Sequence, residues 1–169
     1  MDYLALKSKY ALLGRDFLTW LYRRVDETDG QLKEAGKDTE IFFDDSLTVV
    51  GEGDSPAAST FQGQPQSMKS ELRAALRSGK KITRAKLHVI RPDGEWSFVL
   101  DTDEWVVRSL KVPNGVSDGS DEEAVLLDRL AQLEQIEATL EQMFDAYLKI
   151  RVNSKAYQEL GESLSAWIS

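Results

Sequence analysis

Residues 67–103, SMKSELRAALRSGKKITRAKLHVIRPDGEWSFVLDTD, contain the signals that decide the fold of this chain. The segment begins with a basic, amphipathic pattern, passes through Ser78-Gly79, and continues as two apolar runs on either side of Asp93-Gly94. This order predicts a short basic helix followed by a β-hairpin. Gly79 is typical of the left-handed residue that follows the last turn of a helix.

The hairpin turn is predicted at Asp93-Gly94, because both central residues of a type I′ turn need positive φ angles. Alternation from Thr83 onward places Ala85, Leu87 and Val89 on one face, which we expect to be buried. The turn then fixes the register of the two strands. The cross-strand pairs predicted by this register are Leu87 with Leu100, Val89 with Phe98, Lys86 with Asp101, and Arg84 with Asp103.

Basic charge is concentrated in the same segment. From residue 69 to residue 91, eight basic residues accompany one acid, a local charge of +7 in a chain whose net charge is −8. Such a concentration is typical of a surface that binds a polyanion, whereas the acidic remainder of the chain would repel nucleic acid. The candidate nucleic-acid-binding residues are Lys69, Arg73, Arg77, Lys80, Lys81 and Arg84.

These candidates differ in their expected surroundings. Arg84 and Lys86 have an alternative interpretation, in which they only balance acids on a solvated face of the sheet. The other five candidates, from Lys69 to Lys81, have no obvious local acidic partner. They are therefore the stronger candidates for binding DNA phosphates.

The composition of the 169-residue chain argues against an enzyme. It contains no cysteine and a single histidine, His88, which excludes disulfides, thiol chemistry and histidine-rich metal sites. The vicinal acids Asp44-Asp45 are predicted to form a turn between short strands at 41–43 and 47–50, in preference to a metal site. Ser78-Gly79-Lys80 lacks the earlier glycine of a phosphate-binding loop. We therefore predict a non-catalytic protein without a cofactor or a metal site.

Helical periodicity dominates both ends of the chain. Residues 4–27 repeat apolar side chains three and four apart, which predicts a helix whose aromatic stripe packs under a sheet. A helix of about 30 residues is predicted to begin at the capping box 120–123. Asn153-Ser154 should end it and cap a second helix, and we expect these two helices to pack antiparallel. An edge strand is expected at 57–61 and a further strand at 105–111.

Together these elements predict an α+β fold, in which an antiparallel sheet of five or six strands is joined by an amino-terminal helix, a short basic helix and a carboxy-terminal helical hairpin. The expected organisation is an α+β domain at 1–116 and a helical hairpin at 117–169, packed on that domain or on a second subunit. The long helix carries more apolar surface than the shorter last helix can cover. Self-association through Leu133 and Leu140 is therefore expected.

Several segments resemble the carboxy-terminal half of the recombination-associated protein RdgC family. They are residues 13–21 (LGRDFLTWL), Ser78-Gly79-Lys80 with Thr83 and Arg84, residues 95–101 (EWSFVLD) and residues 108–113 (RSLKVP). The resemblance implies a bacterial or phage nucleoid protein that binds DNA without sequence preference as a ring-shaped homodimer and restrains strand-exchange recombinase activity. The basic positions of the family fall on Lys80 and Arg84.

We therefore expect a non-catalytic, sequence-independent DNA-binding protein that modulates recombination. It would act as a homo-oligomer at the nucleoid, with a recombination protein as a further partner. No apolar run is long enough for a signal peptide or a membrane span, so a cytoplasmic location without membrane contact is expected. The alternative is a protein-interaction or oligomerisation module of a phage or bacterial protein without direct DNA binding, whose long helix docks a partner.

Overall fold

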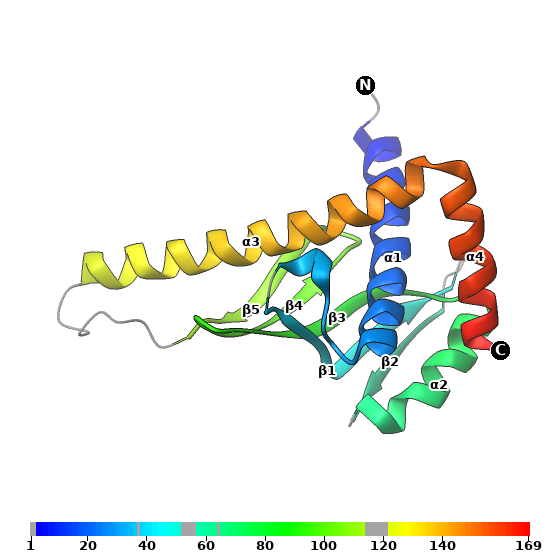
Figure 1. The fold of residues 1–169 in the computed structure, drawn as a ribbon, viewed down its shortest axis with the longest axis horizontal. Helices are drawn as coiled ribbons and strands as arrows, with labels where there is room; N and C mark the ends of the chain where they lie inside the picture. Colours follow the sequence, from blue (N-terminus) through cyan, green and yellow to red (C-terminus); the bar gives the residue numbers. More distant parts are fainter. Residues whose placement is uncertain (1–2, 37, 52–56, 64, 114–121) are drawn as a thin grey trace.

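The computed structural model describes residues 3–36, 38–51, 57–63, 65–113 and 122–169, with side chains described for all of these except 3–13 and 65–67 (Figure 1). The described elements are α1 (Tyr3–Thr28), η1 (Lys33–Ala35), β1 (Glu40–Val50), β2 (Ala58–Gln62), α2 (Pro65–Arg77), β3 (Lys81–Arg91), β4 (Gly94–Asp101), β5 (Val106–Lys111), α3 (Glu122–Val152) and α4 (Ser154–Ile168). The five strands form one antiparallel sheet in the order β2-β1-β3-β4-β5. The predicted α+β fold is confirmed, including the edge strand β2.

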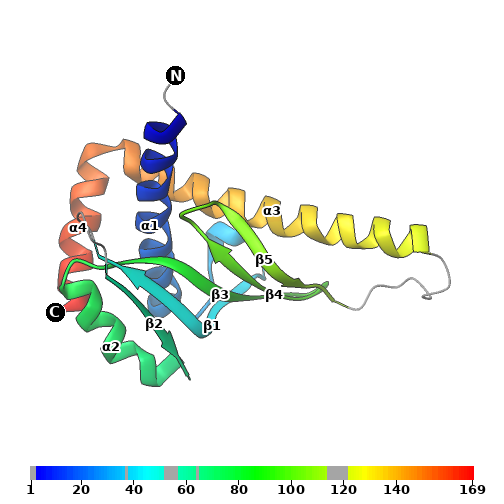
Figure 2. The same ribbon diagram turned by 180° about the vertical axis from the view of Figure 1, so that it is seen from behind.

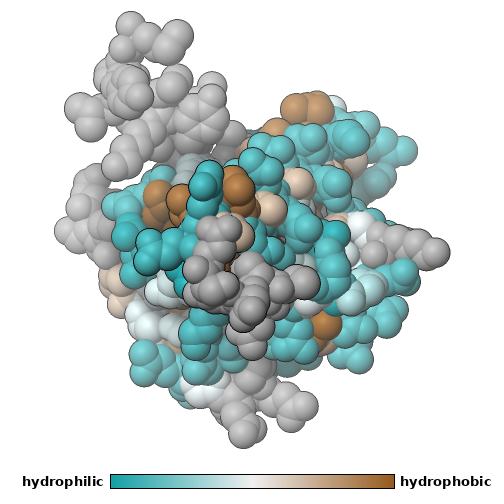
Figure 3. Space-filling view, turned by 90° about the vertical axis from the view of Figure 1, so that its left-hand side faces the viewer, coloured by the Kyte–Doolittle hydropathy of each residue, from teal (hydrophilic) through white to brown (hydrophobic). Residues whose placement is uncertain are grey.

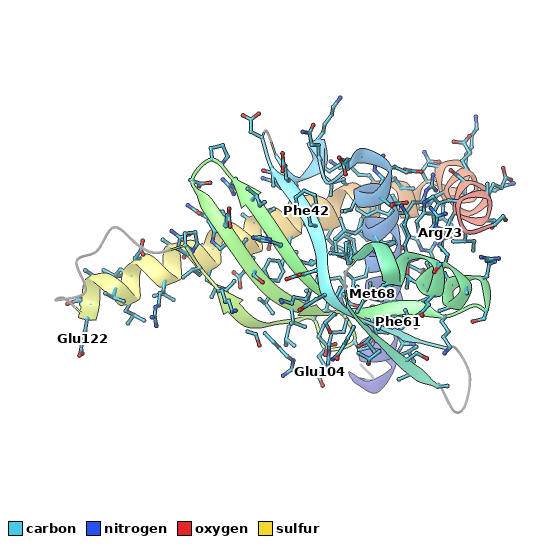
Figure 4. The ribbon with its side chains drawn as sticks, turned by 90° about the horizontal axis from the view of Figure 1, so that it is seen from below. Phe42, Phe61, Met68, Arg73, Glu104 and Glu122 are labelled. Carbon is cyan, nitrogen blue, oxygen red and sulfur yellow. The ribbon has the colours of Figure 1, made fainter. Side chains whose placement is uncertain are left out.

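All the helices lie on one face of the sheet (Figures 1 and 2). α1 crosses over β3 and β1, α2 lies beside β1 and β2, and the middle of α3 contacts β4 through a hydrogen bond from the Trp96 indole to Gln132 at 3.0 Å. Figure 4 shows the opposite face of the sheet, which no described helix covers. The core lies between the sheet and the helices, and its largest fully buried side chains include Trp96, Tyr147, Phe17, Phe98, Leu87 and Ile136. The burial of Phe17 and Trp20 also confirms the aromatic stripe of α1 over its described side chains.

The β3–β4 hairpin has a register two residues away from the predicted one. Pro92 and Asp93 form the turn, and Arg91 pairs with Gly94. Proline explains the difference, because its fixed φ suits a turn and its nitrogen cannot donate a hydrogen bond to a strand. A shift of two residues keeps every side chain on its face, so the buried face was predicted correctly. The observed pairs include Arg84 with Asp101, Ala85 with Leu100, Leu87 with Phe98, and Val89 with Trp96.

Residues 40–50 form one strand, so the prediction of two short strands around a turn is wrong. β1 continues through Asp44-Asp45, with an irregularity in its pairing with β3 between Phe43 and Leu47. The Lys86 ammonium on β3 lies 2.9 Å from a carboxylate oxygen of each acid. These bonds lower the pKa of Asp44 and raise the pKa of Lys86. Asp44 and Asp45 thus stabilise the irregular part of β1 by binding Lys86 on the neighbouring strand β3. Lys86 therefore does not bind Asp101, its predicted partner.

The two carboxy-terminal helices form as predicted but do not pack antiparallel. Asn153 alone separates α3 from α4, and its side-chain oxygen accepts a hydrogen bond from the Ala156 amide at 3.1 Å, which confirms the predicted cap. α4 turns steeply away from α3 and runs along α1 towards α2 (Figures 1 and 4). A one-residue connection is shorter than the loops that join antiparallel helices, so the chain bends without reversing. The predicted capping box at 120–123 lies partly outside the described residues.

Candidate nucleic-acid interface

The six candidate residues do not form one surface. Lys69, Arg73 and Arg77 lie four apart on α2, as the predicted stripe requires, and Lys80 and Lys81 follow at the α2–β3 junction. Arg84 lies on the uncovered face of the sheet, opposite Asp101. The structure therefore divides the candidates between α2, the junction and the open sheet face.

Two cations of the α2 stripe bind Asp26 of α1. Lys69 forms an ion pair with its carboxylate, and Arg73 Nη2 lies 3.2 Å from Asp26 Oδ2. The indole N–H of Trp167 donates to the same oxygen at 2.9 Å, and the Arg73 guanidinium lies 4.7 Å from the centre of a Trp167 ring, where Figure 4 shows Arg73 beside α4. Burial favours a higher pKa for Asp26, but the hydrogen bonds from Lys69 and Trp167 and the positive charges of Lys69 and Arg73 together outweigh it and lower the pKa. Asp26 thus joins α1, α2 and α4.

Lys81 and Arg84 are also bound to acids. Lys81 Nζ lies 2.6 Å from Asp16 Oδ1 on α1. Arg84 Nε donates to Asp101 at 3.0 Å, and Lys86 binds Asp44 and Asp45. Arg84 and Lys86 do balance acids, but not in the predicted pairs with Asp103 and Asp101.

Lys69, Arg73 and Lys81 have no local acidic partner, as expected, but each binds an acid that is distant in the sequence. Their partners lie on α1, at least 43 positions earlier in the chain. Local sequence inspection could not find pairs that only the packing of α1 creates.

Arg77 and Lys80 remain the more available cations of the set. Arg77 is exposed at the end of α2 and makes no ion pair or hydrogen bond with any described residue. Lys80 Nζ donates to the neutral Ser59 hydroxyl at 2.7 Å. Gly79, with φ of +84°, brings the chain from α2 into β3 as predicted. Among the six candidates, basic charge without an acidic partner in the described residues is therefore limited to the corner between α2 and β3.

A second surface lies at the other end of the molecule, where α3 begins. Leu126, Leu127 and Leu130 are 57%, 60% and 48% exposed. Leu126 and Leu130 line a groove of about 750 Å³ between α3 and the end of β5. Figure 3 views the molecule from this end and shows hydrophobic side chains among hydrophilic ones. We call the three leucines the α3 leucine patch.

Neither a candidate metal-ion cluster nor a candidate membrane-spanning helix occurs in the described part of the chain. No group of three or more histidine, cysteine, aspartate or glutamate side chains there could hold a metal ion. None of its helices combines the length and the apolar character of a membrane span.

Comparison of the sequence with protein-family models and with curated proteins finds no match. The resemblance to the RdgC family therefore stays a prediction that rests on the quoted motifs.

The α3 residues predicted to mediate self-association are not the ones that the structure leaves most exposed. Leu140, which was predicted to be in the contact, packs against the core, and Leu133 lines the groove. The apolar repeat continues along all of α3, so periodicity alone cannot show where the sheet stops covering it. The extra apolar residue Leu127, next to Leu126 and three before Leu130, was the available signal of a wider apolar face.

Proposed function

We propose that this protein is a non-catalytic assembly module that self-associates through the α3 leucine patch and the adjoining edge of β5. The observation that carries the proposal is the contrast along α3. Its later apolar residues Ile136, Met143 and Tyr147 are fully buried, whereas the leucines of the patch are half exposed. An apolar surface that adjoins a groove is typical of an interaction site.

The surroundings of the patch favour a second copy of the chain as the partner. β5 is an edge strand of the sheet, so its outer backbone groups are available for pairing. Lys111 on β5 is exposed, while Glu122, Glu123 and Asp128 lie on the first turns of α3. Two copies related by a two-fold axis could place the basic strand of each beside the acidic helix start of the other.

The test is a Leu127→Glu and Leu130→Glu double variant. We expect it to raise the dissociation constant of the assembly by roughly 10²- to 10⁴-fold, because the two leucines together lose about 3–6 kcal/mol of burial in the interface. Analytical ultracentrifugation across a concentration series measures this change. Val152→Glu is the matched control, since Val152 is 81% exposed at the opposite end of α3. A strictly monomeric unsubstituted protein at high concentration would refute the proposal.

Sequence-independent DNA binding that modulates recombination is the second candidate function. Its specific support is the α2–β3 corner, where Arg77 and Lys80 have no acidic partner among the described residues. The resemblance to the RdgC family also places one of that family's basic positions at Lys80. The support is narrower than the local charge suggests, because Lys69, Arg73, Lys81 and Arg84 are in ion pairs.

Titration of single- and double-stranded DNA across salt concentrations tests this candidate. For an Arg77→Ala and Lys80→Ala double variant, we expect similar weakening on every sequence and a salt slope reduced by up to about two phosphate contacts. Lys149→Ala is the matched control, because Lys149 is an exposed cation on α3 away from the corner. Unchanged affinity and salt slope in the double variant would remove the corner as a DNA site.

A further inference from the structure

A pocket of about 220 Å³ lies where α1, the α2–β3 junction, the last turns of α3 and α4 meet (Figure 1). Its walls are mostly apolar and include Trp20, Leu76, Leu160, Leu164 and Ile168. Gly161 lines the pocket from α4, and a Cβ added there would point into open space. The absence of a side chain at Gly161 therefore helps to keep the pocket open.

The charged groups of the pocket favour an anion. Lys80, Lys81 and Asp16 line it, which leaves an excess of one positive charge. Lys81 is paired with Asp16 at 2.6 Å, but Lys80 has only the neutral hydroxyl of Ser59 as its partner, at 2.7 Å. A negatively charged group near Lys80 would therefore gain a charge-assisted hydrogen bond.

The Tyr147 hydroxyl provides a second, independent sign of a missing ligand. Tyr147 is fully buried and lines the pocket, and no described residue accepts a hydrogen bond from its hydroxyl, because the neighbouring Arg151 guanidinium is only a donor. Burial, followed by the Asp16 carboxylate, raises the pKa of this phenol, so it stays protonated at neutral pH. Buried polar groups are almost always paired, so an acceptor is missing here.

We propose that this pocket binds a small amphiphilic carboxylate whose apolar chain or ring lies among Trp20, Leu160 and Leu164. The carboxylate supplies an acceptor for the Tyr147 hydroxyl and a negatively charged partner for Lys80, whose ammonium donates to the neutral Ser59 hydroxyl. A cavity of about 150 Å³ in another protein holds benzene, so this pocket has room for one ring or a chain of about eight carbons. The pocket lies at the opposite end of α3 from the leucine patch, so this site is independent of self-association (Figure 1).

Titration of the full chain with octanoate, followed by calorimetry and by ¹H–¹⁵N NMR, tests the site. We expect saturable binding that shifts the amide signals of Gly161 and Gly79, both of which line the pocket. Octan-1-ol is the neutral probe and should bind more weakly, because it lacks the anionic group. Octanoate that does not saturate the protein, or that shifts only signals of the α3 leucine patch, would overturn the proposal.

Two kinds of substitution test the site separately: one fills the pocket, and the other removes a polar group from it. Gly161→Leu should weaken octanoate binding at least tenfold, whereas Gly161→Ala, the matched control, should stay within about threefold, because a methyl group fills little of the space. Lys80→Gln should weaken octanoate about twofold to fivefold and leave octan-1-ol unchanged. Unchanged octanoate affinity in folded Gly161→Leu would show that the ligand lies elsewhere.

Tyr147→Phe tests the buried hydroxyl directly. It should weaken octanoate binding without lowering the stability of the free protein, because it removes an unpaired buried hydroxyl. A purely structural role for the hydroxyl would give the reverse result, a less stable protein with unchanged octanoate affinity.

Discussion

Replacing Asp101 by alanine is expected to destabilise the protein by about 2–4 kcal/mol. Asp101 ends β4 and is 3% exposed. Its carboxylate accepts from Arg84 Nε at 3.0 Å and from the backbone amides of Asp103 and Glu104 at 3.2 and 3.4 Å. Arg84 Nη2 donates to the same carboxylate, so alanine would remove four hydrogen bonds and with them the side chain that holds the β4–β5 turn. Denaturant unfolding followed by circular dichroism measures the loss.

A double-mutant cycle on Arg84 extends this prediction to the strand register. Arg84→Ala alone should cost about 1 kcal/mol or less, because Arg84 is half exposed. Its coupling energy with Asp101 should exceed about 0.5 kcal/mol, while its coupling with Asp103 should be near zero, since Asp103 binds Arg15 at 2.7 Å. Coupling between Arg84 and Asp103 would instead support the register in which Asp93-Gly94 forms the turn.

The elements of the fold could be predicted because their signals are local. The spacing of Leu72 and Leu76 on α2, the left-handed Gly79 and the cap at Asn153 each depend on a few neighbouring residues. The buried face of β3 was also correct, because alternation survives an error of two residues in register. What could not be derived was the choice between Pro92-Asp93 and Asp93-Gly94 as the turn, where two turn signals overlap.

The candidate site was harder to predict because its charges are paired across the fold. Asp16 and Asp26 look like solvated residues of an amphipathic helix, yet packing of α1 places them beside Lys81 and Lys69. A charge sum over residues 69–91 therefore overstates the positive charge that a DNA phosphate would meet. The direction of α4 was similarly hidden, because it depends on the contacts of Trp167 with Arg73 and Asp26.

The Tyr147 pocket was not accessible to sequence reasoning at all. Its walls come from four separate parts of the chain, and Tyr147 belongs to the same apolar repeat as the ordinary core residues of α3. Only the fold shows that its hydroxyl lacks an acceptor and that Gly161 lines the same pocket with open space at its Cβ position.

Two glycine-to-alanine substitutions in helices are expected to change stability in opposite directions. Alanine is favoured over glycine by about 1 kcal/mol inside a helix. At Gly14 of α1, however, an added Cβ would lie 2.6 Å from Thr102 Cβ and 2.7 Å from the Thr102 carbonyl oxygen. Thr102 cannot easily move, because it is fully buried and its amide and hydroxyl both donate to the Thr83 carbonyl, at 2.9 and 3.0 Å.

We therefore expect Gly14→Ala to destabilise the protein by about 1–3 kcal/mol, as overpacked cores do, and to lower the melting temperature by several degrees. Gly161→Ala on α4 is the matched control, because its Cβ meets open space, and it should stabilise the protein by about 0.5–1 kcal/mol. Thermal and denaturant unfolding of both variants measure the difference. If Gly14→Ala were as stabilising as Gly161→Ala, α1 could not pack directly against the β4–β5 turn. The close approach of Gly14 to Thr102 would then be wrong.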